Sequence, residues 1–445
     1  MAEPGKEHLL RTAHLALEAA RKAGAEWCDV VVSQGQDVGV EIENGSISAA
    51  EVVESRAVSV RAFVAGGRGL CVANGYEEHE VEVAAERAVR MAQAAEPDPD
   101  FKSLPDPEPA GRVAGLYDAA VADMPVSRVV EIAAVNIDGA RAVEPTVIVM
   151  GDVGKSSSSV AVVNSAGAEF FRRGSHLDVG MHTIIRRGGD AGSFFDFDTG
   201  RRLRDVDPLS VGQRAATVAL TFLGAKTVRS ARMPVVLGPL ASYSLLGSLA
   251  WSTNAENIQR RRSFMVGRLG QKVGSSLLTL TDDGLIPAGL RSGSHDGEGA
   301  VRRRVLLFED GVFRAMLHNS YTAGKANEPD TGHGNQGGGI SPTNLQPRLG
   351  TVTSQEIIAD TKEGLYINVG SLGPDPASGD ISSSVDFGFK IENGRLAYPV
   401  TNTMISGHIF EVLANIDAVS SDYREEPGNR LPTIRIRDMQ VAGAG

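Results

Sequence analysis

The chain has 445 residues, enough for two or three domains of about 100–200 residues each. Hydrophobic residues make up 42% and charged residues 22%, a balance typical of a globular protein with a large core. The net charge of −11 argues against broad nucleic-acid binding, which needs a basic surface. With only two cysteines, a polar N-terminus and no run of about 20 apolar residues, the sequence predicts a cytoplasmic protein without membrane contact.

The first 96 residues predict an α+β unit. Apolar residues recur at three- and four-residue spacing in the first segment, which predicts a helix that ends at Gly24. Asn-Gly and Gly-Gly pairs between alternating apolar segments indicate tight hairpin turns. The expected elements are a helix over 5–24, strands over 29–33 and 38–42, a turn at Asn44-Gly45, a hairpin within 57–73 turning at Gly66-Gly67, and a helix over 78–95.

Residues 97–111 carry five prolines among acidic residues, a composition typical of a linker. We expect a second α+β domain over 112–228 and a larger, β-rich core domain with glycine-rich turns over 229–445. In the second domain we expect a helix over 126–142, strands over 147–150, 158–163, 168–172 and 177–185, and a helix over 209–222. In the core domain we expect hairpins that turn at Asp310-Gly311 and Asn393-Gly394. The sequence therefore predicts the α+β class, with helices on mixed sheets first and a β-rich domain last.

Two glycine-containing segments resemble phosphate-binding loops. Residues 332–337 match Gly-x-Gly-x-x-Gly, but a dinucleotide fingerprint needs a helix directly afterwards, and 338–342 (Gly-Gly-Ile-Ser-Pro) is a poor helix start. The segment 332–339 is either a flexible glycine loop or a loop over a cleft. Gly154-Lys155-Ser156 resembles the end of a P-loop, but Val149 stands where the first glycine is needed, so we predict a hairpin turn there.

The nine histidines form no His-Glu-x-x-His pattern, and no two are three to five residues apart. The sequence Ser294-His295-Asp296 is no catalytic triad, because adjacent side chains point in diverging directions. We expect a polar turn there. Metal ligands gathered from distant segments, such as His318, His333 and His408, remain an alternative.

Two runs of three arginines, at 260–262 and 302–304, stand out in an acidic chain. One interpretation is a solvated face with local ion pairs. The other is a guanidinium fork that binds a carboxylate, such as a peptide C-terminus or an acidic partner surface.

Several short segments occur along the chain in an order that is typical of one protein family. These segments are residues 43–45, 257–264, 270–273, 280–284, 308–311, 321–323, 342–345, 378–382 and 391–394. This order resembles the TldD/PmbA (TldE) family, the modulator-of-gyrase peptidases, over nearly the whole chain. In that family a TldD-type subunit carries a His-Glu-x-x-x-His helix and a late cysteine, which hold a metal. A TldE/PmbA-type subunit lacks both and pairs with TldD.

The segment at the position of the family's metal helix, 246–257, contains no histidine, and Ser420 and Ser421 stand near the position of the late cysteine. The resemblance therefore implies a TldE/PmbA-like subunit with no metal ligand or catalytic residue of its own. It implies pairing with a zinc-bearing, TldD-like subunit that hydrolyses small, unfolded or modified peptides.

We expect seven polar residues to line the substrate channel: Asn254, Asn257, Arg261, His318, Tyr321, Asn335 and Asn344. The first three lie in or next to the segment that replaces the metal helix, and the others lie in the glycine-rich half. Each is equally well explained as a helix cap, a turn residue or a buried polar side chain with satisfied hydrogen bonds. Two other functions stay open, a stand-alone amide hydrolase or tailoring enzyme with scattered ligands, and a non-enzymatic adaptor.

Overall fold

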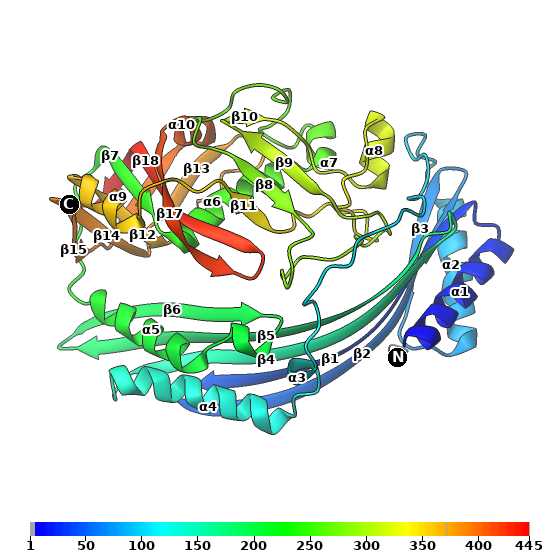
Figure 1. Ribbon diagram of the computed structural model, residues 1–445, viewed down its shortest axis with the longest axis horizontal. Helices are drawn as coiled ribbons and strands as arrows, with labels where there is room; N and C mark the ends of the chain where they lie inside the picture. Colours follow the sequence, from blue (N-terminus) through cyan, green and yellow to red (C-terminus); the bar gives the residue numbers. More distant parts are fainter. Residues whose placement is uncertain (1–4, 371, 445) are drawn as a thin grey trace.

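The computed structural model describes residues 5–370 and 372–444. Its N-terminal half contains six antiparallel strands, which are β1 (Trp27–Glu43), β2 (Ser46–Val64), β3 (Gly67–Ala73), β4 (Ile148–Asn164), β5 (Glu169–Arg187) and β6 (Asp190–Gly200). They form one long, curved sheet in the order β3-β2-β1-β4-β5-β6 (Figure 1). Because β1 pairs with both β2 and β4, the segments before and after the proline-rich stretch share this sheet. The domain boundaries at 96, 112 and 228 stay a prediction.

The long strands differ from the short ones that the sequence predicts. Strands expected over 29–33 and 38–42 are parts of β1, which pairs continuously through the polar residues between them. The hairpin turn expected at Gly154-Lys155-Ser156 is wrong, because this segment lies inside β4 between β1 and β5. Lys155 is buried, and its Nζ donates to Gln36 Oε1 at 2.7 Å and to the carbonyl of Ala122 at 3.0 Å. These acceptors replace water and let a lysine occupy the middle of a sheet.

Helices cover one face of the N-terminal sheet. The long ones are α1 (Lys6–Lys22), α2 (Glu78–Ala94), α4 (Val126–Val143) and α5 (Pro208–Thr221), and short turns form α3 (Ala119–Ala122) and a 3-10 helix (Leu203–Asp205). Val30 of β1 packs in a core with α1 and α2, and Val40 packs in a core with α4 and α5. Since side chains alternate along a strand, Asp29 points to the opposite face, where the C-terminal half lies (Figure 1).

The C-terminal half contains two further sheets around a shared core. The smaller sheet has the order β10-β9-β8-β11, and the larger one β13-β16-β18-β7-β12-β14-β15 with β17 beside β18. The strands are β7 (Ala231–Leu237), β8 (Leu280–Asp283), β9 (Arg304–Glu309), β10 (Val312–Phe313), β11 (Leu345–Pro347), β12 (Glu363–Val369), β13 (Asp380–Ser384), β14 (Phe387–Glu392), β15 (Arg395–Pro399), β16 (Thr403–His408), β17 (Ile416–Glu426) and β18 (Asn429–Gly443). The helices are α6 (Pro239–Ser252), α7 (Ala255–Gln259), α8 (Ser320–Ala326), α9 (Ser354–Asp360) and α10 (Ile409–Ala414).

Helix α6 contributes to this core, in which Leu245 and Leu249 are buried in one cluster with residues of both sheets. The predicted α+β class, with a β-rich C-terminal half, is confirmed. The predicted hairpin turn at Asn44-Gly45 is also confirmed, and both residues adopt positive φ. None of the helices in the described part of the chain has the length and apolar character needed to cross a bilayer.

Candidate functional site

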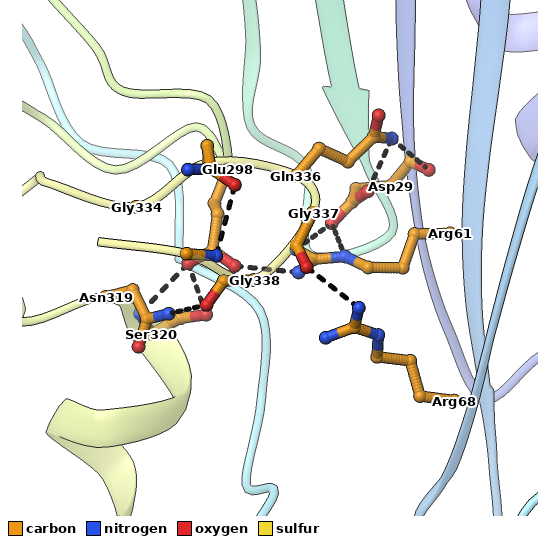
Figure 2. Close-up of polar contacts among 12 residues, drawn as sticks. Asp29, Arg61, Arg68, Glu298, Asn319, Ser320, Gly334, Gln336, Gly337 and Gly338 are labelled. Carbon is orange, nitrogen blue, oxygen red and sulfur yellow. Dashed lines mark hydrogen bonds and ion pairs between the residues drawn. The ribbon is translucent and has the colours of Figure 1, made fainter. Parts of the chain in front are cut away.

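The glycine-rich loop 332–339 lies between the N-terminal sheet and the C-terminal half (Figure 2). Gln336 Nε2 donates to Asp29 Oδ1 on β1 at 2.9 Å. Arg68 Nη2 on β3 donates to the carbonyl of Gly337 at 2.8 Å. The sheet therefore anchors the loop with one carboxylate, which accepts from Gln336, and one guanidinium, which donates to Gly337.

Internal backbone pairs close this loop, and no helix follows it. The N–H of Asn335 donates to the carbonyl of Gly339 at 3.0 Å, and its own carbonyl accepts from Gly338 at 2.8 Å. An isolated antiparallel bridge joins Gly334 to Ile340, and the next regular element is the strand β11. Without a following helix the loop lacks the dipole and the N–H groups of a dinucleotide site.

Beside the loop, Arg61 of β2 is enclosed by two carboxylates (Figure 2). Its Nε donates to Asp29 Oδ2 and its Nη1 to Glu298 Oε1, each at 2.8 Å. The three side chains are between 1% and 3% exposed. Burial opposes the charge of Arg61, but Asp29 and Glu298 together outweigh it and raise the pKa of the guanidinium. Glu298 Oε2 also accepts from the N–H and hydroxyl of Ser320, so both carboxylate oxygens are engaged.

Residues of this loop line two cavities. The larger one, about 470 Å³, is bordered by Gly334 and Asn335 of the loop and by five arginines from four segments, which are Arg172, Arg173, Arg201, Arg291 and Arg302. The smaller one, about 110 Å³, is bordered by Gly338, Tyr321 and the two arginines of the sheet, Arg61 and Arg68.

The seven residues predicted for the substrate channel do not line one cavity. Asn335 lines the larger cavity, and Tyr321 lines the smaller one. The hydroxyl of Tyr321 donates to Asp98 Oδ2 at 2.9 Å, and burial raises the pKa of this phenol. The other five line neither of these two cavities.

Asn254 and Asn344 are buried and hold the segments that flank the loop. Asn254 caps α7, and its Nδ2 donates to the carbonyl of Ile340 at 3.1 Å. Asn344 Nδ2 donates to Ser292 Oγ at 2.9 Å, and its Oδ1 accepts from the N–H of Arg291 at 3.2 Å. Since Arg291 and Ser292 border the larger cavity, Asn344 fixes one of its walls.

His318 lies in the protein interior, ahead of α8. Its Nδ1 lies 3.2 Å from Thr322 Oγ1, and its carbonyl accepts from the hydroxyl of Thr331. Burial lowers the pKa of His318. The neighbouring His333 is also buried, with Nε2 2.9 Å from Asp282 Oδ1. Both rings are therefore held by groups of the fold.

Asn257 and Arg261 lie near the surface after α6. Asn257 is partly exposed, and its carbonyl accepts from the N–H of Arg262 at 2.7 Å. Arg261 is exposed and has a φ of +57°. The role of all seven residues in a substrate channel stays a prediction.

The segment 246–257 forms the end of α6 and the start of α7. Leu246 and Leu249 are buried in the core, so this helix presents aliphatic and hydroxyl groups rather than imidazoles. Ser420 is buried and donates to the carbonyl of Asp422 at 2.6 Å. Across residues 5–370 and 372–444, His, Cys, Asp and Glu side chains form no group of three or more that could hold a metal ion. The hydroxyls, amides and single carboxylate of segment 246–257 do not supply the three ligands that a zinc site needs.

Sequence reasoning identified only one arginine of the larger cavity, Arg302, as a candidate carboxylate ligand. The others come from β5, from the segment after β6 and from a loop near position 291, and no sequence spacing relates them. Arg172 and Arg173 are adjacent at the end of the strand predicted over 168–172, where a pair of charged residues is equally typical of a solvated surface.

Three domain models of one known family together match most of the chain. The model for PmbA/TldA metallopeptidase domain 1 matches residues 28–92, that for the central domain 120–223, and that for the C-terminal domain 230–443.

Individual proteins match over similar lengths. A Haemophilus influenzae metalloprotease PmbA homolog is 23% identical over 461 residues, covering 98% of this chain and 97% of its own. A Methanocaldococcus jannaschii protein named as a metalloprotease is 24% identical over 420 residues, covering 91% of each. The crystal structure of TldE from Thermococcus kodakarensis has the same fold, with a TM-score of 0.89, 24% identity and coverage of 97% of this chain and 100% of its own. The chain belongs to the PmbA/TldD (TldE) metallopeptidase family.

Proposed function

We propose that this chain is a TldE/PmbA-like subunit that pairs with a TldD-like metallopeptidase in the cytoplasm. The pair hydrolyses small, unfolded or modified peptides, and this chain shapes the substrate channel. The TldD-like subunit supplies the zinc and its activated water, which need about three protein ligands and an open position.

One observation carries this proposal. In a member of a metallopeptidase family, the segment 246–257 buries Leu246 and Leu249 where the resemblance places metal-binding histidines. The donors left on this segment are hydroxyls, amides and the single carboxylate of Glu256, which pairs with Arg260, and these do not replace two imidazoles. Relatives named as metalloproteases support peptide hydrolysis as the activity of the assembly.

The exposed half of β2 is the surface that we expect the TldD-like subunit to contact. Within the described residues, 46–55 of β2 pair with β1 alone, because pairing with β3 begins at Val58. Val52 and Val53 are 47% and 46% exposed and point to opposite faces of the sheet. A long strand edge with exposed apolar side chains is a template for another chain.

The test is to express this chain with and without a TldD-like subunit and to assay hydrolysis of an unstructured fluorogenic peptide. We expect co-purification, activity of the pair and no activity of this chain alone. Val52→Lys combined with Val53→Lys should abolish pairing, whereas Leu396→Lys, at an exposed site on β15, should not. Pairing without any peptidase activity would favour an adaptor instead, and activity of this chain alone would refute the proposal.

A further inference from the structure

Five arginines converge on the cavity of about 470 Å³ between the N-terminal sheet and the C-terminal half. They are Arg172 and Arg173 of β5, Arg201 directly after β6, and Arg291 and Arg302 of the C-terminal half. In residues 5–370 and 372–444, no carboxylate oxygen lies within 4.0 Å of a nitrogen of these guanidinium groups. The cavity is therefore strongly positive in a chain whose net charge is −11.

The arginines of this cavity bond only to uncharged groups of the fold. Arg201 donates to backbone carbonyls, and Arg302 Nη1 donates to the carbonyl of Gly332 at 3.2 Å. Arg173 donates to the hydroxyl of Tyr117 and stacks on its ring at 3.7 Å. The Nε groups of Arg173 and Arg302 are buried without an acceptor among the described residues. Buried donors are normally satisfied, so the fold leaves these two guanidinium groups with incomplete hydrogen bonding.

Arg172 has the least compensated charge of the five. Within the described part of the chain its guanidinium makes no hydrogen bond, and burial together with repulsion from Arg302 and Arg201 lowers its pKa to about 10. The carboxylate of Asp296 is the acidic group that acts on it, but both oxygens of Asp296 already accept from backbone N–H groups. An unbalanced charge of this kind costs stability, which is typical of a site kept for a ligand.

We propose that this cavity binds the carboxylate groups of an acidic peptide, with Arg172, Arg201 and Arg302 holding the anionic groups. Guanidinium groups form paired, charge-assisted hydrogen bonds with carboxylates, and a cluster of three accommodates more than one. The choice of a peptide rests on the proposed function, whereas the anion site rests on the five arginines alone.

The rest of the lining favours a peptide over a nucleotide. Leu116, Val160, Leu290 and Pro342 provide apolar surface for side chains. The lining includes no Phe, Tyr or Trp, and its one aromatic ring, that of His333, is fully buried and pairs with Asp282, so no aromatic face is open to a nucleobase. The volume lies within the range of about 300–1,000 Å³ that is usual for small-molecule sites and exceeds the need of one inorganic phosphate.

The test is calorimetric titration of the full-length chain, without any partner subunit, with an acetylated hexapeptide that ends in Asp-Asp and has a free C-terminus. The matched neutral probe ends in Asn-Asn and is amidated, and inorganic phosphate serves as a competitor. We expect the acidic peptide to bind and the neutral one to bind about tenfold more weakly or not at all.

Variants locate the site. Arg172→Met and Arg201→Met should each weaken binding of the acidic peptide about tenfold, because each removes one of the guanidinium groups that hold its carboxylates. Arg303→Met is the matched control, because Arg303 is exposed, pairs with Glu108 and does not border the cavity. Equal binding of both peptides, unchanged affinity in both cavity variants, or displacement by equimolar phosphate would each overturn the proposal. Because the titration contains no partner subunit, a failure of subunit pairing does not change its result. A failure of peptide binding likewise does not change the result of the pairing experiment.

Discussion

Arg61 of β2 and Glu298 of the C-terminal half form an ion pair at 2.8 Å, although 237 positions separate them in the chain. Asp29 completes the cluster, so one buried cation meets two buried carboxylates. Such a cluster contributes little net stability compared with an apolar replacement, but loss of one partner leaves a buried charge unpaired. The cluster therefore couples the N-terminal sheet to the C-terminal half.

We predict that Arg61→Met lowers the free energy of unfolding by about 3–5 kcal/mol, because Asp29 and Glu298 are then left buried together without a cation. Urea denaturation followed by circular dichroism measures this loss. The control is Arg90→Gln, which breaks only the exposed pair with Glu86 on α2 and should change stability by less than about 0.5 kcal/mol. Equal effects of the two variants would contradict the coupling role.

The glycine loop should tolerate substitution unevenly. Gly332 has a φ of +70°, and a Cβ there would lie 2.3 Å from the carbonyl oxygen of Val301. Gly332→Ala should therefore lower the free energy of unfolding by more than about 1 kcal/mol. Gly337 has no positive φ and would meet only the flexible side chain of Asn335, so Gly337→Ala should be nearly neutral. Thermal unfolding of both variants checks this, and a neutral Gly332→Ala would show that the loop backbone is not fixed.

Stability should depend on pH through His318. Burial lowers the pKa of this imidazole in the folded state, although Glu328 opposes the shift. Below the unfolded-state pKa of about 6.5, the unfolded chain binds a proton that the folded chain does not, so this group destabilises the fold as pH falls. Relative to His318→Gln, the wild type should lose up to about 1.4 kcal/mol per pH unit below that value. Parallel stability curves from pH 7.5 to 5 would contradict this.

Arg172→Met should raise the melting temperature by a few degrees in the absence of ligand. The variant removes a cation that repels Arg302 and Arg201, and it removes no hydrogen bond within the described residues. Differential scanning calorimetry measures the change. A lower melting temperature would show that Arg172 stabilises the fold rather than serving a ligand.

Sequence patterns predicted most helices and the tight turns because these depend on local chemistry. Apolar spacing located α1 and α5 closely, and the pair Asn44-Gly45 adopts the positive φ angles that a tight hairpin turn needs. The length of β1 and β4 was not predictable, because their polar middle segments pair with strands that are distant in sequence. Lys155 is the sharpest case, since Gln36 and Ala122 satisfy it from other elements.

The candidate site was predictable only in part, for a similar reason. Asn335 and Tyr321 border cavities, whereas Asn254 and Asn344 support the segments around the glycine loop. The arginine cavity arises where four separate segments meet, and its defining property is that none of its five guanidinium groups forms an ion pair with a carboxylate of the described residues. That property depends on how distant segments pack together, so no single stretch of sequence predicts it.

The most direct test of the proposed metal-free role is the zinc content of each purified chain and of the reconstituted pair, measured together with peptidase activity. We predict no stoichiometric zinc on this chain, about one zinc per pair, and activity only in the pair. Stoichiometric zinc on this chain alone, with hydrolysis of the same peptide in the absence of any partner, would contradict the account.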